Sequence, residues 1–231
     1  MPFRYFKISP EIIQLAVMMF VRFPLSLRNV EDLLHERGID VCHESVRLWV
    51  DRFGPMLSGK IRVRRASYMR QIPQWRWHLD EVYVKIRGET HYLWRAVDHE
   101  GEVLESYVTK ARDKSAALKF LRKAMKRYGA PKTIVTDRLR SYGAAMKTIG
   151  NADRQEVGRH LNNRAENSHL PFRRRERAMS RFRRMSQLQE FASIHASLHN
   201  HFNLDRHINR RKTFKTQRDA APLEWHQLLT G

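Results

Sequence analysis

Three segments with a period of two follow one another between residues 75 and 110, and this pattern constrains the fold more than any other. WRWHLDEVYVKI is followed by Gly88, then THYLWRAVD, a second turn at 99–101, and EVLESYVTK. Such alternation is typical of strands with one buried face, and the short Gly-containing connections predict hairpins. The sequence therefore predicts a three-stranded antiparallel meander.

The residues after the meander predict an α/β arrangement. A helix is expected over 113–129, a short apolar strand of the parallel type over 131–137, and a short helix over 141–150. Residues 150–158 resemble a surface connection, and 160–204 predict one or two long helices. This order fits a ribonuclease-H-like mixed sheet flanked by helices.

The first 55 residues predict three helices. Ser9 and Ser26 are suitable N-caps, and Gly38 separates the second helix from HESVRLWVDRFG. Two helices joined by a short Gly-containing turn, with Arg47 and Arg52 on the second, follow the helix-turn-helix plan. A three-helix cap without DNA contacts is the alternative.

We therefore expect four regions along the chain. A small all-α helix-turn-helix domain occupies 1–57, and a polar, basic linker or extended arm follows over 58–73. The catalytic α/β domain is expected over 74–205, and a basic C-terminal tail over 206–231.

The charge balance indicates a polyanionic partner. There are 44 Lys and Arg against 24 Asp and Glu, a formal net charge of +20, and nucleic acid is the commonest partner of such a chain. The single cysteine, Cys42, excludes a disulfide framework. The apolar run over 11–23 is too short and too polar to span a membrane, and we find no Gly-rich phosphate loop. A cytoplasmic protein without a membrane partner or nucleotide cofactor is expected.

Three acidic residues are candidates for metal chemistry. Asp80 lies on the predicted first strand with the parity of Val82 and Val84, whereas Glu81 points to the opposite face. Asp137 ends the predicted parallel strand, where ligands bind in open α/β sheets, although a turn-forming role is its alternative. Glu166 falls in the first turns of a predicted helix, where a surface glutamate is the alternative. If the three converge, they can hold two hard cations such as Mg²⁺.

An arginine run follows Glu166 in the same segment. Its members are Arg173, Arg174, Arg175 and Arg177. Like charges at this density repel one another unless phosphates are near, so we expect DNA contacts there. A solvated helix face is the alternative.

Three segments resemble a known family. HLDEVYV, IVTDRLRSYGAA and above all NNRAENSHLPFRRRERAMSRFR are similar to the DDE transposases of bacterial insertion sequences, in the group whose type element is insertion sequence six. The resemblance implies Asp80, Asp137 and Glu166 as the catalytic triad and two Mg²⁺ ions, with Mn²⁺ as a substitute. It also implies cleavage at terminal inverted repeats and transfer of the freed 3′-hydroxyl to target DNA.

The same resemblance places a basic residue, Arg173, two helical turns after Glu166, and a homo-oligomer on DNA is expected. Twenty-eight residues separate Asp137 from Glu166, fewer than in the type members, which predicts a shortened loop within 150–158. A non-catalytic helix-turn-helix regulator and a ribonuclease-H-like nuclease or integrase are the rival functions.

Overall fold

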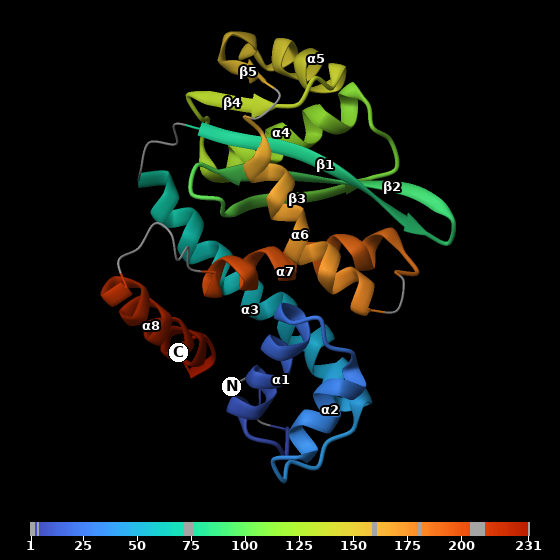
Figure 1. The fold of residues 1–231 in the computed structure, drawn as a ribbon, viewed down its shortest axis with the longest axis vertical. Helices are drawn as coiled ribbons and strands as arrows, with labels where there is room; N and C mark the ends of the chain where they lie inside the picture. Colours follow the sequence, from blue (N-terminus) through green and yellow to red (C-terminus); the bar gives the residue numbers. More distant parts are fainter. Residues whose placement is uncertain are drawn as a thin grey trace. The chain divides into compact units, whose positions relative to one another are not determined.

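The computed structural model describes residues 3, 5–71, 76–158, 161–179, 182–203 and 211–230 (Figure 1). The chain forms two compact units. The first comprises residues 1–63, 174–180 and 197–231, and the second comprises residues 64–173 and 181–196. The expected domain boundaries at 73/74 and 205/206 lie outside the described residues.

The second unit contains a five-stranded mixed sheet. Its strands are β1 (Arg76–Ile86), β2 (Glu89–Asp98), β3 (Val103–Thr109), β4 (Thr133–Thr136) and β5 (Gln155–Val157), in the order β3-β2-β1-β4-β5. The first three pair in antiparallel fashion, and β4 is parallel to β1 and to β5. The predicted meander, the parallel strand and the ribonuclease-H-like fold class are confirmed.

One face of this sheet is covered by α4 (Lys114–Tyr128) and α5 (Arg140–Ile149). Trp77 and Trp94 are completely buried and pack with Phe120 and Tyr142 in the main core. As predicted, Asp113 begins α4: its carboxylate accepts the N–H of Ala116 at 2.8 Å.

Two helices occupy the segment for which one or two are expected. These are α6 (Asn163–Ala178) and α7 (Met185–Phe202). Within the second unit, Phe172 of α6 contacts Phe191 and His195 of α7 through their rings. Residues of β1 and β2 with the opposite parity to Trp77 and Trp94 contact α6, so this helix lies on the other face of the sheet (Figure 1).

The expectation of a plain surface connection over 150–158 is wrong. A 3₁₀ turn, Ala152–Arg154, leads into β5, which pairs with β4 and forms one edge of the sheet. A three-residue strand is too short for its alternation to stand out in the sequence.

The first unit contains the three predicted N-terminal helices. They are α1 (Pro10–Arg22), α2 (Leu27–His35) and α3 (His43–Gln71), of which residues 64–71 belong to the second unit. Ser26 begins α2 with a capping box that it shares with Asn29, whereas Ser9 makes no side-chain cap bond at α1. The buried residues of these helices are mainly apolar, and include Val17, Val30, Leu34, Val46 and Phe53.

The linker expected over 58–73 is instead helical as far as Gln71, because α3 continues without interruption through Pro55. Leu57, Ile61 and Met69 are buried at helical spacing, which explains why this basic segment is ordered.

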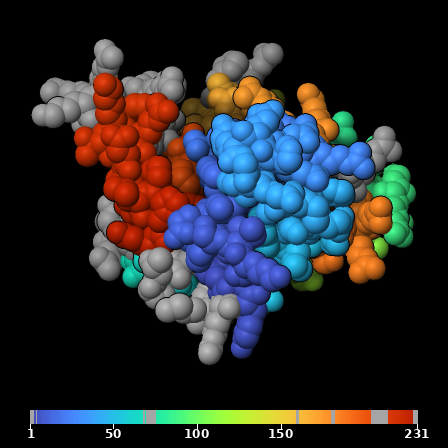
Figure 2. Space-filling view, turned by 90° about the horizontal axis from the view of Figure 1, so that it is seen from below, coloured from blue at the N-terminus to red at the C-terminus, as the bar shows by residue number. Residues whose placement is uncertain are grey.

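The C-terminal segment also forms a helix, α8 (Arg211–Thr230), within the first unit. Figure 2 shows α8, in red, against α1, in dark blue. The imidazole of His226 lies 3.0 Å from Gln14 of α1, and Lys60 donates to the carbonyl of Leu228. In the part of the chain that the structure describes, we find no helix with the length and apolar character that crossing a membrane requires.

Candidate metal centre

Asp80 and Asp137 follow paired positions on two neighbouring strands. Leu79 of β1 is in parallel register with Thr136 of β4, so the next residue on each strand is an aspartate. Carboxylate oxygens of Asp80, Glu81 and Asp137 all lie within 4.8 Å of one another. The structure therefore brings together the two aspartates singled out in the sequence, with Glu81 as an additional member.

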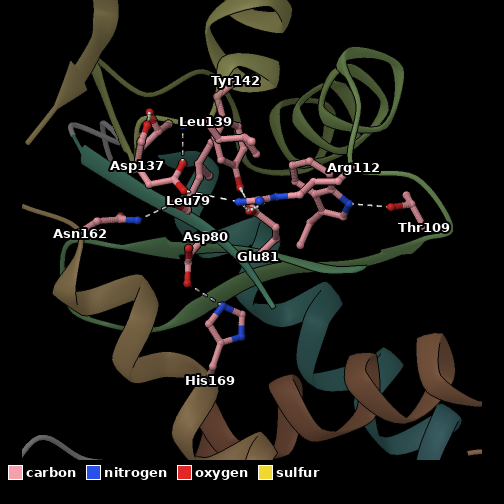
Figure 3. A network of polar contacts seen from close by, with 12 residues as sticks. Leu79, Asp80, Glu81, Thr109, Arg112, Asp137, Leu139, Tyr142, Asn162 and His169 are labelled. Atoms are coloured by element: carbon pink, nitrogen blue, oxygen red, sulfur yellow. Dashed lines mark hydrogen bonds and ion pairs between the residues drawn. The ribbon is translucent and has the colours of Figure 1, made fainter. Parts of the chain in front are cut away.

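Glu81 leans away from Asp80 and is held by two partners (Figure 3). The hydroxyl of Tyr142 donates to its Oε2 at 2.8 Å, and Nε of Arg112 donates to its Oε1 at 2.6 Å. The Glu81 side chain is only 1% exposed. Burial raises its pKa, and the hydrogen bond from Tyr142 opposes that rise.

Asp80 points toward α6. Its Oδ2 lies 3.3 Å from Nε2 of His169. Burial raises the pKa of Asp80 to about 6, and the negative charge of Asp137 adds to the effect. Burial, together with Arg95 and Arg173, lowers the pKa of His169 well below its usual value, so His169 is neutral at pH 7.

The donor set fits a divalent cation. Three carboxylates this close repel one another, and their oxygens are the ligands that hard cations prefer. Among the described residues, Arg112 is the cation that contacts the cluster, with Nη2 at 3.7 Å from Oδ2 of Asp137. One guanidinium and a neutral imidazole leave net negative charge where Asp80 of β1 approaches Asp137, directly after β4.

Residues on one face of α6 contact β1. Nδ2 of Asn162, just before the helix, donates to the carbonyl of Leu79 at 2.8 Å. His169 contacts the Asp80 carboxylate, and Arg173 donates to the carbonyl of Tyr83. Positions 162, 166, 169 and 173 share one helix face, so Glu166 lies between residues that contact β1. Its side chain is exposed, and it lies outside the group of three clustered acids.

The four arginines expected to contact DNA differ in exposure. Arg174 and Arg177 are exposed, and Arg173 is half-buried. Arg175 is 1% exposed, and its Cζ lies 4.1 Å from the centroid of the Phe20 ring. Its Nε donates to the carbonyl of Phe20, and burial lowers its pKa to about 10. The expectation of a DNA contact for Arg175 is therefore wrong, because this side chain belongs to the core of the first unit.

This burial predicts a stability effect. An Arg175→Met variant keeps the apolar contact with Phe20 but leaves its carbonyl without that N–H, which should cost about 1–3 kcal/mol of unfolding free energy. The matched variant Arg174→Met, on an exposed neighbour, should leave stability within about 0.5 kcal/mol of the wild type. Urea unfolding of the two variants gives the comparison. Equal stability would show that Arg175 contributes nothing to the core.

Both arginines of the predicted recognition helix are exposed. Arg47 forms ion pairs with Glu44 at 2.6 Å and Asp51 at 3.6 Å on its own helix. The guanidinium of Arg52 lies 5.3 Å from the Phe6 ring centroid. Exposed ion pairs of this kind contribute little to stability, so Arg47 can leave its carboxylate partners at small cost.

Several residues of the site escape sequence reasoning. Arg112 and Tyr142 lie far from Glu81 along the chain, and no spacing rule connects them to it. Asn162 and His169 carry a weak signal, because they fall at helical spacing around Glu166.

Comparison with known proteins agrees with this geometry. The family model described as "DDE domain" matches residues 74–205. The transposase for insertion sequence-like element IS431mec of Staphylococcus aureus is 34% identical over 174 residues, which covers 72% of this chain and 75% of the relative. The transposase for insertion sequence element IS257 in transposon Tn4003, also from Staphylococcus aureus, is 33% identical over the same shares.

Two solved structures are also similar. The HTLV-2 integrase catalytic core domain matches with a TM-score of 0.42 and 14% identity, over 62% of this chain and 93% of that one. The catalytic core domain of BIV integrase matches with a TM-score of 0.39 and 12% identity, over 66% and 99%.

The family model spans more than half of the chain, and the staphylococcal relatives extend the similarity to 72% of it. On these two grounds, the chain belongs to the DDE transposase family.

Proposed function

We propose that this transposase cleaves DNA at the terminal inverted repeats of an insertion sequence and joins the freed ends to target DNA, using Asp80, Asp137 and Glu166. The observation that carries the proposal is the approach of the carboxylates of Asp80, within β1, and Asp137, directly after β4. The negative charge that they concentrate there is suited to divalent cations. Bound cations would supply charge stabilisation to the attacking and leaving oxygens of phosphoryl transfer.

Glu166, rather than Glu81, is assigned as the third ligand. Glu81 already has two donors, Tyr142 and Arg112, and its side chain is almost fully buried. Glu166 is exposed, yet it lies on the helix face whose neighbours contact Leu79 and Asp80. A small change in side-chain rotamer is enough to move an exposed glutamate, whereas Glu81 would have to break two hydrogen bonds.

Magnesium is the metal that we assign to the site. The clustered donors are the carboxylate oxygens of Asp80, Glu81 and Asp137. Mg²⁺ and Mn²⁺ prefer such oxygen donors, whereas soft metals select sulfur and nitrogen. Two divalent ions would more than neutralise three carboxylates, which leaves positive charge for phosphate oxygens.

DNA is the partner that the charge of the chain supports. The net charge of +20 favours phosphate binding. We assign Arg174 and Arg177 to phosphate contacts because both are exposed, and Arg173 to DNA close to the metal site. The helix-turn-helix of the first unit would recognise the repeats, and a DNA-associated homo-oligomer in the cytoplasm would bring two ends together.

A strand-transfer assay tests the proposed activity. The purified chain is mixed with labelled duplexes from both ends of the DNA that flanks its coding sequence, a target plasmid and Mg²⁺. Joined products are expected with Mg²⁺ and not with Ca²⁺, whose looser coordination lacks the required geometry. Cut but unjoined strands would indicate a nuclease, and binding without any cleavage would indicate a regulator. Either result would overturn the proposal.

A second test concerns the recognition helix. Arg47→Ala and Arg52→Ala should each weaken binding to the terminal repeat by about 1–3 kcal/mol for every hydrogen-bonded base that the arginine no longer reads. Binding to a random duplex should change much less, because phosphate contacts elsewhere supply that affinity. Arg28→Ala on α2, which is also exposed, is the matched control and should affect both duplexes equally. Equal weakening by Arg47→Ala on both duplexes would show that Arg47 touches phosphates only.

A further inference from the structure

An exposed aromatic ring follows the metal site along β1. Tyr83 is three residues after Asp80 on β1, about 10 Å along the strand, and it is 61% exposed. The parallel register between β1 and β4 ends at Leu79 and Thr136. Tyr83 therefore belongs to the part of β1 that continues past β4, with the parity of Glu81 rather than that of Asp80.

Arg173 of α6 is fixed against this tyrosine. Its guanidinium donates to the Tyr83 carbonyl, and its Cζ lies 5.6 Å from the Tyr83 ring centroid. The same helix face holds Glu166 and His169, and His169 contacts Asp80. The arginine and the tyrosine thus form one composite surface, joined to the metal site through both β1 and α6.

This surface has the chemistry of a base-stacking site. A large aromatic ring exposed to water gains by being covered, and a guanidinium against its π face adds a cation–π contribution. Proteins that bind single-stranded nucleic acid combine aromatic rings with positive charge in this way, since every base has a π face and every nucleotide a phosphate. The exposure of the Tyr83 ring, with Arg173 beside it, leaves room for a base.

We propose that Tyr83, supported by Arg173, stacks with a nucleobase next to the phosphate that reacts at Asp80 and Asp137. The base is a terminal or displaced one, because bases inside a duplex already have both faces covered by neighbours. Tyr83 is thereby a positioning residue for the DNA end. This inference rests on the proposed function, since it places DNA at the metal site.

Fluorescence of 2-aminopurine tests the contact without requiring catalysis. Pre-cut terminal-repeat duplexes carry the analogue at one of the last three positions, and Ca²⁺ is used so that joining does not occur. We expect strong quenching at one position with the wild type and with Tyr83→Phe, which keeps the ring. Tyr83→Leu keeps apolar bulk without the ring, and should lose that quenching and weaken binding of the DNA end by roughly 10-fold.

Lys85→Met is the control for charge, because Lys85 is an exposed residue two positions farther along β1. This variant should quench the 2-aminopurine fluorescence as strongly as the wild type does. The proposal would be overturned if Tyr83→Leu quenched the 2-aminopurine fluorescence as strongly as the wild type does. It would also be overturned if Tyr83→Phe lost the quenching while its melting curve stayed normal. If Tyr83→Leu changes only the sedimentation coefficient, the ring contacts another protein copy and the proposal fails. If the wild type fails to join DNA strands in Mg²⁺, that result counts against the proposed function. The stacking proposal is tested separately, because the fluorescence is measured in Ca²⁺ without joining.

Discussion

An Asp137→Asn variant will bind DNA like the wild type and will lose strand cleavage and joining by about three or more orders of magnitude. Asn keeps the size of the side chain and removes the negative charge with which the carboxylate would hold divalent cations. The fold should survive, because the Asp137 Oδ1 accepts the Leu139 N–H at 3.0 Å and an amide oxygen accepts the same bond. DNA affinity is supplied mainly by Lys and Arg against phosphates.

The comparison uses one protein preparation for both measurements. Binding at a fixed salt concentration and strand transfer in Mg²⁺ are measured side by side for the wild type, Asp137→Asn and Asp153→Asn. Asp153 is an exposed aspartate on the 3₁₀ turn, and its variant should join strands normally. Undiminished joining by Asp137→Asn would show that Asp137 is only a turn residue, and other acids would have to carry the chemistry.

The parts of the fold that could be predicted from sequence are those with long, uniform patterns. The alternation over 75–110 is long enough to specify three strands, and their hairpin turns fix the order of pairing. Once β4 is recognised as a parallel strand beside β1, Asp80 and Asp137 follow as neighbours, because each comes directly after a residue of the pair Leu79 and Thr136. Local pattern and general sheet geometry were sufficient for two of the three acids.

The features that could not be predicted depend on tertiary contacts. Arg175 has the same local sequence as the exposed arginines around it, and only the position of Phe20 decides that it is buried. The basic segment after residue 57 is helical because a few apolar residues within it find a core. Glu81 follows the expected parity, yet its carboxylate lies within 4.8 Å of those of Asp80 and Asp137.

Substitution of Glu81 and of Glu166, each by glutamine, tests which of them is the third metal ligand. Glu166→Gln should reduce joining by about three orders of magnitude, as expected for loss of a ligand to the catalytic metal. Glu81→Gln should keep joining within about tenfold of the wild type, because Gln preserves the shape of the buried side chain and Tyr142 can still donate to the amide oxygen. The amide nitrogen cannot accept from Arg112, so this variant loses one of its two hydrogen bonds. The buried position of Glu81 makes a melting curve necessary for that variant.

Mn²⁺ binding provides the readout that does not depend on catalysis. If Glu166 is a ligand, Glu166→Gln should weaken Mn²⁺ binding measured by calorimetry, and Glu81→Gln should leave it close to the wild-type value. The variant Glu190→Gln, at an exposed glutamate on α7 rather than on the helix face of residues 162, 166, 169 and 173, is the matched control. The reverse result, with joining and Mn²⁺ binding lost only in Glu81→Gln, would make Glu81 the third ligand. Arg112 would then have to leave the carboxylate that it holds in this structure whenever metal binds.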